Sequence, residues 1–359
     1  MLNGIFVPYQ GTFFQIPSNV KVIVQDKQNN ILYEQGLGGY LIKPDINIAM
    51  ASHGASLLDV LTNEQYITTA NDGTPGLKFI FTGDPHADAT RLMGAIAEAL
   101  IVQECNNSPE VNRELAKHAR GGSRISDKAD SYIAIATGSQ QTKLNYKQFY
   151  NPSDTQRDII WIDKNNTEYQ LSSISPGIPS SSTKPAGLQV KTSHNYKYVT
   201  NSIKQYHYPV VYFDLNNDWH EAFHQIQKMN ENNNGVLATL VPPDEVLLYL
   251  KSRLLNYFNI IVSLFKDECT LTDIIENSKI GGDSILAGIA DTAAPDSGSK
   301  IICEVNRISS APSIDPITSL APSFTHTPAP TPEPTSTFTG NNRKDWFEDG
   351  WWSDEDDHF

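Results

Sequence analysis

The sequence predicts an α/β fold, in which helices pack against a sheet, and two observations lead to this prediction. Between about residues 88 and 230, short apolar and β-branched runs typical of strands are interleaved with segments of helical character. This alternation is the pattern of a sheet covered by helices. The chain also has 359 residues, of which 39% are hydrophobic, enough for one large domain or two ordinary ones with a sizeable core.

Residues 1–83 are expected to form a β-rich N-terminal region. Short runs of β-branched and aromatic residues are separated there by Gly, Asn and Asp residues typical of turns. The strands predicted from these runs lie at residues 20–24, 39–42 and 77–81.

The central region, residues 84–241, contains the elements of the predicted sheet. Strands are expected at residues 132–136, 158–162, 187–191, 209–213 and 236–241. Helices are expected at residues 88–106, 108–119, 198–206 and 218–230. The first helix is apolar around almost its whole circumference, which predicts that it is buried. The Ser- and Pro-rich residues 171–186 are interpreted as an inserted loop.

The last third of the chain divides into three parts. Residues 242–310 are predicted to form a helical cap, because residues 242–276 have the pattern of two helices. Residues 311–344 are dominated by Pro, Thr and Ser and are predicted to be a disordered linker. Residues 345–359 form an acidic, Trp-rich peptide.

Seven of these fifteen C-terminal residues are acidic, and three of the five tryptophans of the chain lie among them. A disordered solubilising tail is one interpretation, but it does not require tryptophans. We favour a tethered ligand that binds a protein partner or the basic cleft of its own chain. The peptide is similar in character to the acidic tails of single-stranded-DNA-binding proteins.

Composition limits the classes of function. The 27 Lys and Arg residues against 41 Asp and Glu residues give a net charge of −14, so the averaged surface repels phosphate backbones and anionic membranes. Any nucleic-acid site must therefore be a local basic cleft. The start of the chain lacks the pattern of a secretory signal, no segment is apolar enough to span a bilayer, and the three cysteines suggest neither disulfides nor a zinc site. A cytoplasmic location is expected.

Four residues form the candidate site: Glu98, Asp158, Gln189 and Lys191. Gln189 and Lys191 are spaced i, i+2 on a predicted strand, so both side chains lie on one face, while Leu188 and Val190 point into the opposite layer. Asp158 opens the neighbouring apolar run and is expected to emerge beside Gln189. Glu98 is a carboxylate among apolar helical neighbours, where it is costly unless something pairs with it.

The chemistry of these side chains suits a divalent cation. Mg²⁺ prefers oxygen ligands, so Asp158, the amide carbonyl of Gln189 and the carboxylate of Glu98 are candidate ligands. Lys191 would stabilise the extra charge of a phosphorane-like transition state. The set therefore predicts metal-assisted hydrolysis of phosphodiesters, with Mg²⁺ as cofactor and Mn²⁺ as a substitute.

From about residue 88 to residue 230, the chain resembles the PD-(D/E)XK nuclease superfamily, which has the restriction-endonuclease-like fold. The resemblance lies in the order of the elements: a buried helix with Glu98, a strand, a strand opened by Asp158, a strand with Gln189 and Lys191, a helix, and the buried strand at 209–213. It implies a mixed sheet flanked by helices and a Mg²⁺-dependent DNA endonuclease with a role in restriction or anti-phage defence. Asp158 would then be a metal ligand, Lys191 the catalytic lysine and Glu98 an accessory carboxylate.

Two departures from the family pattern bear on activity. Gln189 stands where the family usually has Asp or Glu, and no proline directly precedes Asp158. An inactivated copy that serves as a non-catalytic nucleic-acid-binding or adaptor protein is therefore an alternative. Another is that Gln189 and Lys191 are only the solvated face of an edge strand. A second Gln-x-Lys pair, at Gln141 and Lys143, lies in a polar stretch without strand character.

Local basic stretches flank the candidate site, although the chain as a whole is acidic. Residues 184–204 contain four lysines and no acid, and residues 113–147 contain seven Lys and Arg against three acids. A phosphate backbone requires such stretches. The residues expected to contact DNA are Lys184, Lys197, Lys204, Arg120 and Arg124. A homodimer is left open.

A second motif, His220, Glu221 and His224, matches the His-Glu-x-x-His signature of zinc peptidases. The two His share a helix face with polar residues, whereas Trp219, Phe223 and Ile226 form the apolar face. We therefore favour a solvated face over the alternative of a zinc metallopeptidase. No phosphate-binding glycine loop occurs in the sequence, so no nucleotide cofactor is expected.

Overall fold

The computed structural model describes residues 4–9, 12–25, 30–70, 73–122, 124–173, 184–232, 239–282, 286–291 and 300–301. All of them belong to the first of the two units into which the chain divides, Met1–Arg307 and Ile308–Phe359. The predicted linker at 311–344 and the acidic peptide at 345–359 lie outside the described residues. No helix in the described part of the chain is long and apolar enough to cross a membrane.

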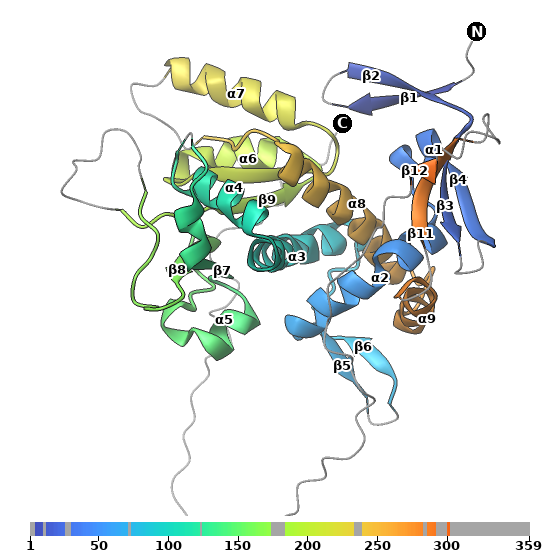
Figure 1. Ribbon diagram of the computed structural model, residues 1–359, viewed down its shortest axis with the longest axis horizontal. Coiled ribbons are helices and arrows are strands. Elements are labelled where there is room, and N and C mark those ends of the chain that lie inside the picture. Colours follow the sequence, from blue (N-terminus) through green and yellow to red (C-terminus); the bar gives the residue numbers. More distant parts are fainter. Residues whose placement is uncertain are drawn as a thin grey trace, which may run out of the picture. The chain divides into compact units, whose positions relative to one another are not determined.

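The described part of the chain is a mixed α/β structure, as predicted, and Figure 1 shows its helices and strands. Strand β7 (Tyr132–Ala136) pairs antiparallel with β8 (Ile159–Asp163), and β9 (Gln189–Ser193) pairs parallel with β10 (Val210–Asp214). An antiparallel bridge between Ile159 and Leu188 joins the two pairs, so the strands follow one another in chain order. A parallel bridge from Leu240 to Val210 is the described part of the strand predicted at 236–241.

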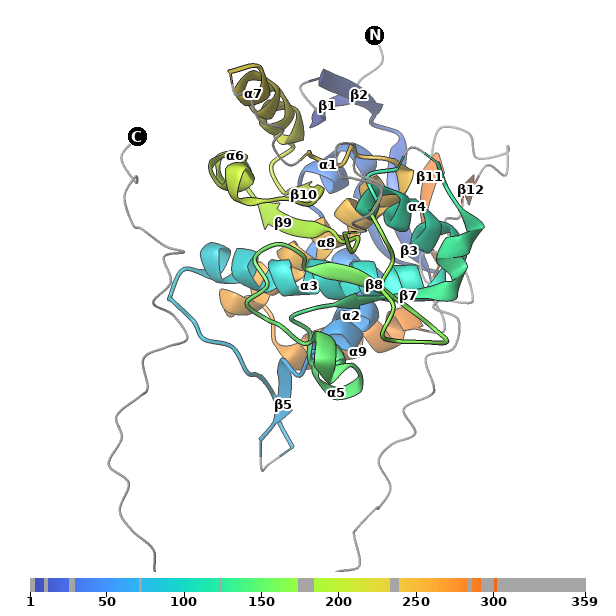
Figure 2. The ribbon, with the colours of Figure 1, turned by 90° about the vertical axis from the view of Figure 1, so that its left-hand side faces the viewer.

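Helix α3 (Pro85–Asn107) packs against this sheet and forms the centre of the core (Figure 2). Its N-terminus is fixed by Asp84, whose carboxylate accepts hydrogen bonds from the backbone N–H groups of His86 and Ala87. The predicted buried helix at 88–106 is confirmed, since Leu92, Met93, Ile96, Leu100 and Ile101 are at most 1% exposed. Helix α4 (Pro109–Ala119) follows, with Ser108 as its N-cap.

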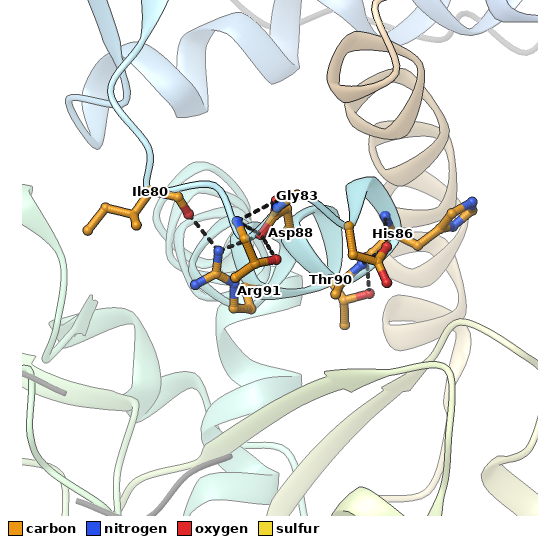
Figure 3. A network of polar contacts seen from close by, with 9 residues as sticks. Ile80, Gly83, His86, Asp88, Thr90 and Arg91 are labelled. Atoms are coloured by element: carbon orange, nitrogen blue, oxygen red, sulfur yellow. Dashed lines mark hydrogen bonds and ion pairs between the residues drawn. The ribbon is translucent and has the colours of Figure 1, made fainter. Parts of the chain in front are cut away.

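A buried carboxylate ties the loop before α3 to the helix (Figure 3). Asp88 accepts hydrogen bonds from the backbone and the hydroxyl of Thr82 and from the backbone N–H of Gly83. Arg91 donates both to Asp88 and to the carbonyl of Ile80. The charge of Asp88 is thus satisfied, although the residue is only 1% exposed.

Helices also pack against β10 through a second apolar cluster. Val199 of α6 (Lys197–Ser202), Ile203 of the 3₁₀ turn η3 (Ile203–Gln205) and Ala222 of α7 (Trp219–Asn232) contact Val210 and Tyr212 there. The helices predicted near 198–206 and at 218–230 are therefore confirmed. The remaining connections are η1 (Asp127–Ser131), α5 (Gln140–Asn145) and η2 (Lys147–Phe149).

The N-terminal region is less β-rich than predicted. It contains β1 (Gly4–Tyr9), β2 (Thr12–Pro17), β3 (Val20–Gln25) and β4 (Ile31–Gly36), then the short pair β5 (Ile67–Thr69) and β6 (Pro75–Leu77). The strand predicted at 39–42 is wrong, since these residues belong to helix α1 (Leu37–Ile42). Of the strand predicted at 77–81, only Leu77 is in a strand.

Helix α2 (Ile46–Asn63) was not predicted, and it is one of the main core elements. Asp45 caps its N-terminus by accepting from the backbone N–H of Asn47 at 2.9 Å. Eleven of its eighteen residues are buried, many of them small, such as Ala49, Ala51 and Gly54. Because the helix is covered on nearly all sides, it lacks the amphipathic pattern that identifies surface helices.

The region after residue 242 begins as predicted and then departs from the prediction. Helices α8 (Glu245–Phe265) and α9 (Leu271–Gly282) are the two predicted helices. The helical cap was predicted to extend to residue 310, but residues after α9 form the strands β11 (Leu286–Asp291) and β12 (Lys300–Ile301). Strand β11 pairs antiparallel with β3 and with β12. One apolar cluster joins α2, α3, α8 and α9 to strands β8, β9 and β10.

Candidate functional site

Three of the predicted site residues converge at the junction of β8 and β9. The Asp158 Oδ2 atom accepts hydrogen bonds from Gln189 Nε2 at 2.5 Å and from the Val190 backbone N–H at 2.7 Å. The Lys191 Nζ atom lies 3.8 Å from the same oxygen. The bridge between Ile159 and Leu188 produces this arrangement, because it sets Asp158 opposite the first residue of β9.

The amide of Gln189 has one oxygen that nothing satisfies. Gln189 is 2% exposed, and among the described residues its Oε1 atom has no hydrogen-bond partner. A buried acceptor without a partner costs about 1–3 kcal/mol. A cation held between this oxygen and the Asp158 carboxylate would remove that cost, so the donor set fits a hard, oxygen-preferring ion such as Mg²⁺.

Burial raises the pKa of Asp158 from 3.8 to about 6. The positive charge of Lys191 and the two N–H donors oppose this rise, and the negative charge of Asp154 adds to it. The side chains of Asp158 and Lys191 are 14% and 12% exposed. The carboxylate is therefore held in a poorly solvated place beside a cation, as is common at functional sites.

Glu98 interacts with this group through charge. Burial raises the pKa of Glu98 well above its usual value, and the negative charges of Asp158 and Glu64 add to the rise, while Lys191 lowers it. Glu98 therefore lies close enough to Asp158, Lys191 and Glu64 for their charges to act on it.

Glu64 is a further carboxylate that the sequence did not indicate. It follows the last residue of α2, and its Oε2 atom accepts from the backbone N–H of Gln140 at 2.8 Å. Burial raises its pKa. Since α2 was not predicted, nothing in the sequence pattern could bring Glu64 close to Glu98.

A cluster of cations and tyrosines lies beside Asp158. Lys184 Nζ lies 4.0 Å from the ring centre of Tyr208, and the Arg157 guanidinium stacks on the same ring at 5.6 Å. Lys191 Nζ lies 5.4 Å from the ring centre of Tyr206. Such contacts stabilise cations at partly desolvated positions. Arg157 and the two tyrosines were not predicted as site residues, although Arg157 directly precedes Asp158.

The other predicted DNA contacts are not drawn into this cluster. Lys197, Lys204 and Arg124 are exposed. The Arg120 Nε atom donates to the backbone carbonyl of Ser172 at 3.2 Å, which gives this side chain a structural role at the C-terminal end of α4. Of the five cations predicted to contact DNA, only Lys184 belongs to the cluster around Tyr208.

The alternative zinc motif lies on the solvent-facing side of α7, as the helix phase predicted. His220, Glu221 and His224 are exposed, and the two Nε2 atoms are 2.8 Å apart. In the described part of the chain, no third His, Cys or carboxylate group joins them in a metal-sized cluster. Two exposed imidazoles alone fall short of the three protein ligands of a catalytic zinc site.

One other group of metal-type ligands exists in the described residues. Ligand atoms of Glu114, His118 and Asp244 lie within 4.8 Å of one another. However, Glu114 forms an ion pair with Lys117, and Asp244 accepts both from the backbone N–H of Leu247 and from the His118 ring. These contacts connect α4 to the start of α8 and account for both carboxylates.

Comparison of the chain with family models, with curated proteins and with solved structures gives no match.

Proposed function

We propose that this protein is a Mg²⁺-dependent DNA endonuclease that hydrolyses phosphodiester bonds and has a restriction-endonuclease-like core at residues 84–241. The observation that carries the proposal is the convergence of Asp158, Gln189 and Lys191, with the Gln189 Oε1 atom buried and without a described partner. The order α3, β7, β8, β9, α6, β10 supports it, because it is the order of elements on which the resemblance rests.

The chain supplies the oxygen ligands and one cation for this chemistry. Asp158, with Gln189 Oε1 and the accessory Glu98, would hold Mg²⁺ or Mn²⁺. When bound, the ion would polarise a phosphoryl oxygen and favour ionisation of a water molecule. Lys191 would stabilise the charge that develops on the phosphoryl group in the transition state. The hydrogen bonds from Gln189 and Val190 keep the Asp158 carboxylate oriented before substrate binds.

DNA as the substrate is supported by the cations beside the site. Lys191 lies 3.8 Å from Asp158, and Arg157 and Lys184 share the ring of Tyr208, in a protein whose net charge is −14. Cations in these positions could contact a phosphate backbone, which the averaged charge of the protein repels. Tyr206 and Tyr208 hold these cations in place.

A plasmid-cleavage assay tests the proposal. Cleavage is expected with Mg²⁺ or Mn²⁺ and not with EDTA, and Asp158→Ala and Lys191→Ala are each expected to reduce the rate at least about 100-fold. Lys143→Ala is the matched control, because Lys143 belongs to the second Gln-x-Lys pair, is exposed and lies 5.5 Å from the ring centre of Tyr150. Cleavage that is unchanged in both site variants would overturn the proposal.

The non-catalytic alternative has a distinct outcome in the same assay. Because Gln189 replaces the usual acidic ligand, a protein that binds DNA without cleaving it in any divalent metal would be an adaptor. For residues 345–359 we propose binding to a protein partner or to the chain's own basic surface. Deletion of these residues is expected to abolish the partner interaction or to raise DNA affinity, and unchanged behaviour in both would indicate a solubilising tail.

A further inference from the structure

A cavity of about 320 Å³ lies along strand β7, next to the candidate site. Residues of α3 line one side of it, residues of α5 and Tyr146 line another, and the C-terminal end of α2 closes it. Its volume is at the lower end of the range for small-molecule sites, about 300–1,000 Å³. The space therefore suits a ligand no larger than a single base or nucleoside.

The polar groups that line this cavity include five amides, three of which donate one hydrogen bond each within the protein. Gln141 Nε2 donates to the carbonyl of Asn63, and Asn145 Nδ2 donates to Gln141 Oε1. The Asn106 amide exchanges two hydrogen bonds with the backbone of Ala134, which closes that part of the β7 edge. These lining amides are thus engaged within the protein.

Two acceptors of the lining stand out because they have one donor or none among the described residues. The Gln103 Oε1 atom is buried and has no hydrogen-bond partner among the described residues. Glu64 also lines the cavity, and the Gln140 backbone N–H is its one hydrogen-bond donor within the described chain. No Lys or Arg of the described residues lines the cavity. A ligand that presents N–H donors and carries no negative charge at this end would satisfy these two acceptors.

We propose that this cavity binds an unpaired guanine of the DNA substrate, which rests on the proposed nuclease function. Guanine offers its N1–H and N2–H₂ groups side by side on one edge, and a carboxylate such as Glu64 accepts from both. The Gln103 Oε1 atom supplies a further acceptor. Thymine presents a single N–H between two carbonyl oxygens, which would face the acceptors of this lining.

The position of the cavity connects base recognition to cleavage. Ala99, which lines it, directly follows Glu98 on α3, and the charge of Glu64 acts on Glu98. A base held in the cavity would thus lie beside the carboxylates of the metal site. Enzymes that act on nucleic acids read unstacked bases through their Watson–Crick edges in enclosed pockets of this kind.

The first experiment measures binding without cleavage. Calorimetric titration of the full chain with the four deoxynucleoside monophosphates, in EDTA, is expected to give at least about 10-fold tighter binding of dGMP than of dTMP. Gln103→Leu is expected to remove this preference, and Gln103→Glu, which keeps an acceptor, is expected to retain it. Gln227→Leu on the exposed face of α7 is the control. Equal binding of the four nucleotides, or no binding, would overturn the proposal.

The second experiment uses a set of single-stranded oligonucleotides, each with one guanine at a different position. In a matched set, an abasic site replaces that guanine. At one position relative to the cut, the replacement is expected to reduce cleavage at least about 10-fold in the wild-type protein and not in Gln103→Leu. Cleavage without any such position would overturn the guanine proposal and leave the nuclease proposal standing. Preference for dGMP in a protein that never cleaves DNA would overturn the nuclease proposal and leave guanine binding by the cavity standing.

Discussion

Gln189 donates a hydrogen bond from Nε2 to Asp158 Oδ2 at 2.5 Å and leaves its own Oε1 atom without a described partner. The neutral amide thus stabilises the Asp158 carboxylate where a second carboxylate would repel it. This pairing gives a physical account of Gln at a position where the nuclease superfamily that the sequence resembles usually has Asp or Glu. It also separates two properties of the site: its stability without a metal, and its affinity for the proposed metal.

Gln189→Glu is expected to exchange one property for the other. Without metal, two adjacent carboxylates repel each other and the Nε2 hydrogen bond is lost, so the variant should be less stable than the wild type by about 1–3 kcal/mol. With Mg²⁺, the added carboxylate is a better ligand than an amide. The rise in melting temperature between EDTA and Mg²⁺ should therefore be larger in the variant.

Gln148→Glu, at an exposed position, is the control for this measurement. Its melting temperature should respond to Mg²⁺ as that of the wild type does. A Gln189→Glu variant whose Mg²⁺ response equals the wild-type response would argue against a metal at Asp158.

Strands β7, β8 and β9 could be predicted from the sequence, because the local pattern of apolar residues in each agrees with the fold. Strand β7 has the predicted bounds, and β8 and β9 differ from them by one or two residues. The i, i+2 spacing of Gln189 and Lys191 correctly predicted that both side chains lie on the same side of the strand as Asp158. Leu188 and Val190 are in the core, as expected. Asp158 could be placed because it begins an apolar run.

The missing parts of the site come from elements without a local signal. Helix α2 is buried on nearly all sides, so its small residues show no amphipathic period, and Glu64 at its end could not be anticipated. The same limit applies to Gln103, since its environment depends on how α2, α5 and β7 meet. Strand β11 pairs with β3 from the far end of the described chain, a contact that no local pattern specifies.

Acid is expected to destabilise the protein through His53, which is buried on α2 against the ring of Tyr257. Burial, with a smaller effect of the positive Arg253, lowers the pKa of His53 from 6.5 to about 3. The unfolded chain therefore takes up a proton between these pH values and the folded chain does not, so stability is complete above pH 6.5 and is lost as the pH falls. The loss from this residue between pH 7 and pH 5 should be about 2 kcal/mol.

Urea unfolding at pH 7 and at pH 5 measures this loss. In His53→Phe the difference between the two pH values should shrink by about that amount, whatever the stability of the variant itself. His207→Phe, at an exposed position, is the control. A difference that is the same in His53→Phe and in the wild type would contradict the assignment.

A buried ion pair holds α8 against the end of β10. Lys251 Nζ lies 2.7 Å from Asp214 Oδ1, with the two side chains 8% and 3% exposed, and Asp214 Oδ2 also accepts from the Trp219 backbone N–H at the start of α7. Removing one partner of such a pair leaves an uncompensated charge, so Lys251→Met should cost about 3–5 kcal/mol in denaturant unfolding. The double variant Asp214→Asn/Lys251→Met should be more stable than Lys251→Met alone, and a double variant of lower stability would show that the ion pair is not the main contribution.

Alanine substitutions at two glycines, Gly187 beside the site and Gly94 in α3, should have opposite effects on stability. A Cβ atom at Gly187 would lie 2.7 Å from Arg157 Cδ and 3.0 Å from the backbone oxygen of Ile159. Arg157 cannot easily move away, because its guanidinium donates to Gln170 and stacks on Tyr208. Gly187→Ala should therefore push β8 and β9 apart beside Asp158, at a cost of about 1–3 kcal/mol.

Gly94 lies in the middle of α3, and a methyl group added there would have open space around it, with no described atom within 4 Å beyond the backbone of its own helix. Gly94→Ala should therefore stabilise the protein by about 0.5–1 kcal/mol, because alanine loses less conformational freedom in a helix than glycine does. Thermal unfolding measures both variants, and Mg²⁺-dependent cleavage should fall only in Gly187→Ala. Since the strands that carry Asp158 and Gln189 are held together at Gly187, a Gly187→Ala protein with unchanged stability and cleavage would mean that the close approach of β8 to β9 is not required by the site.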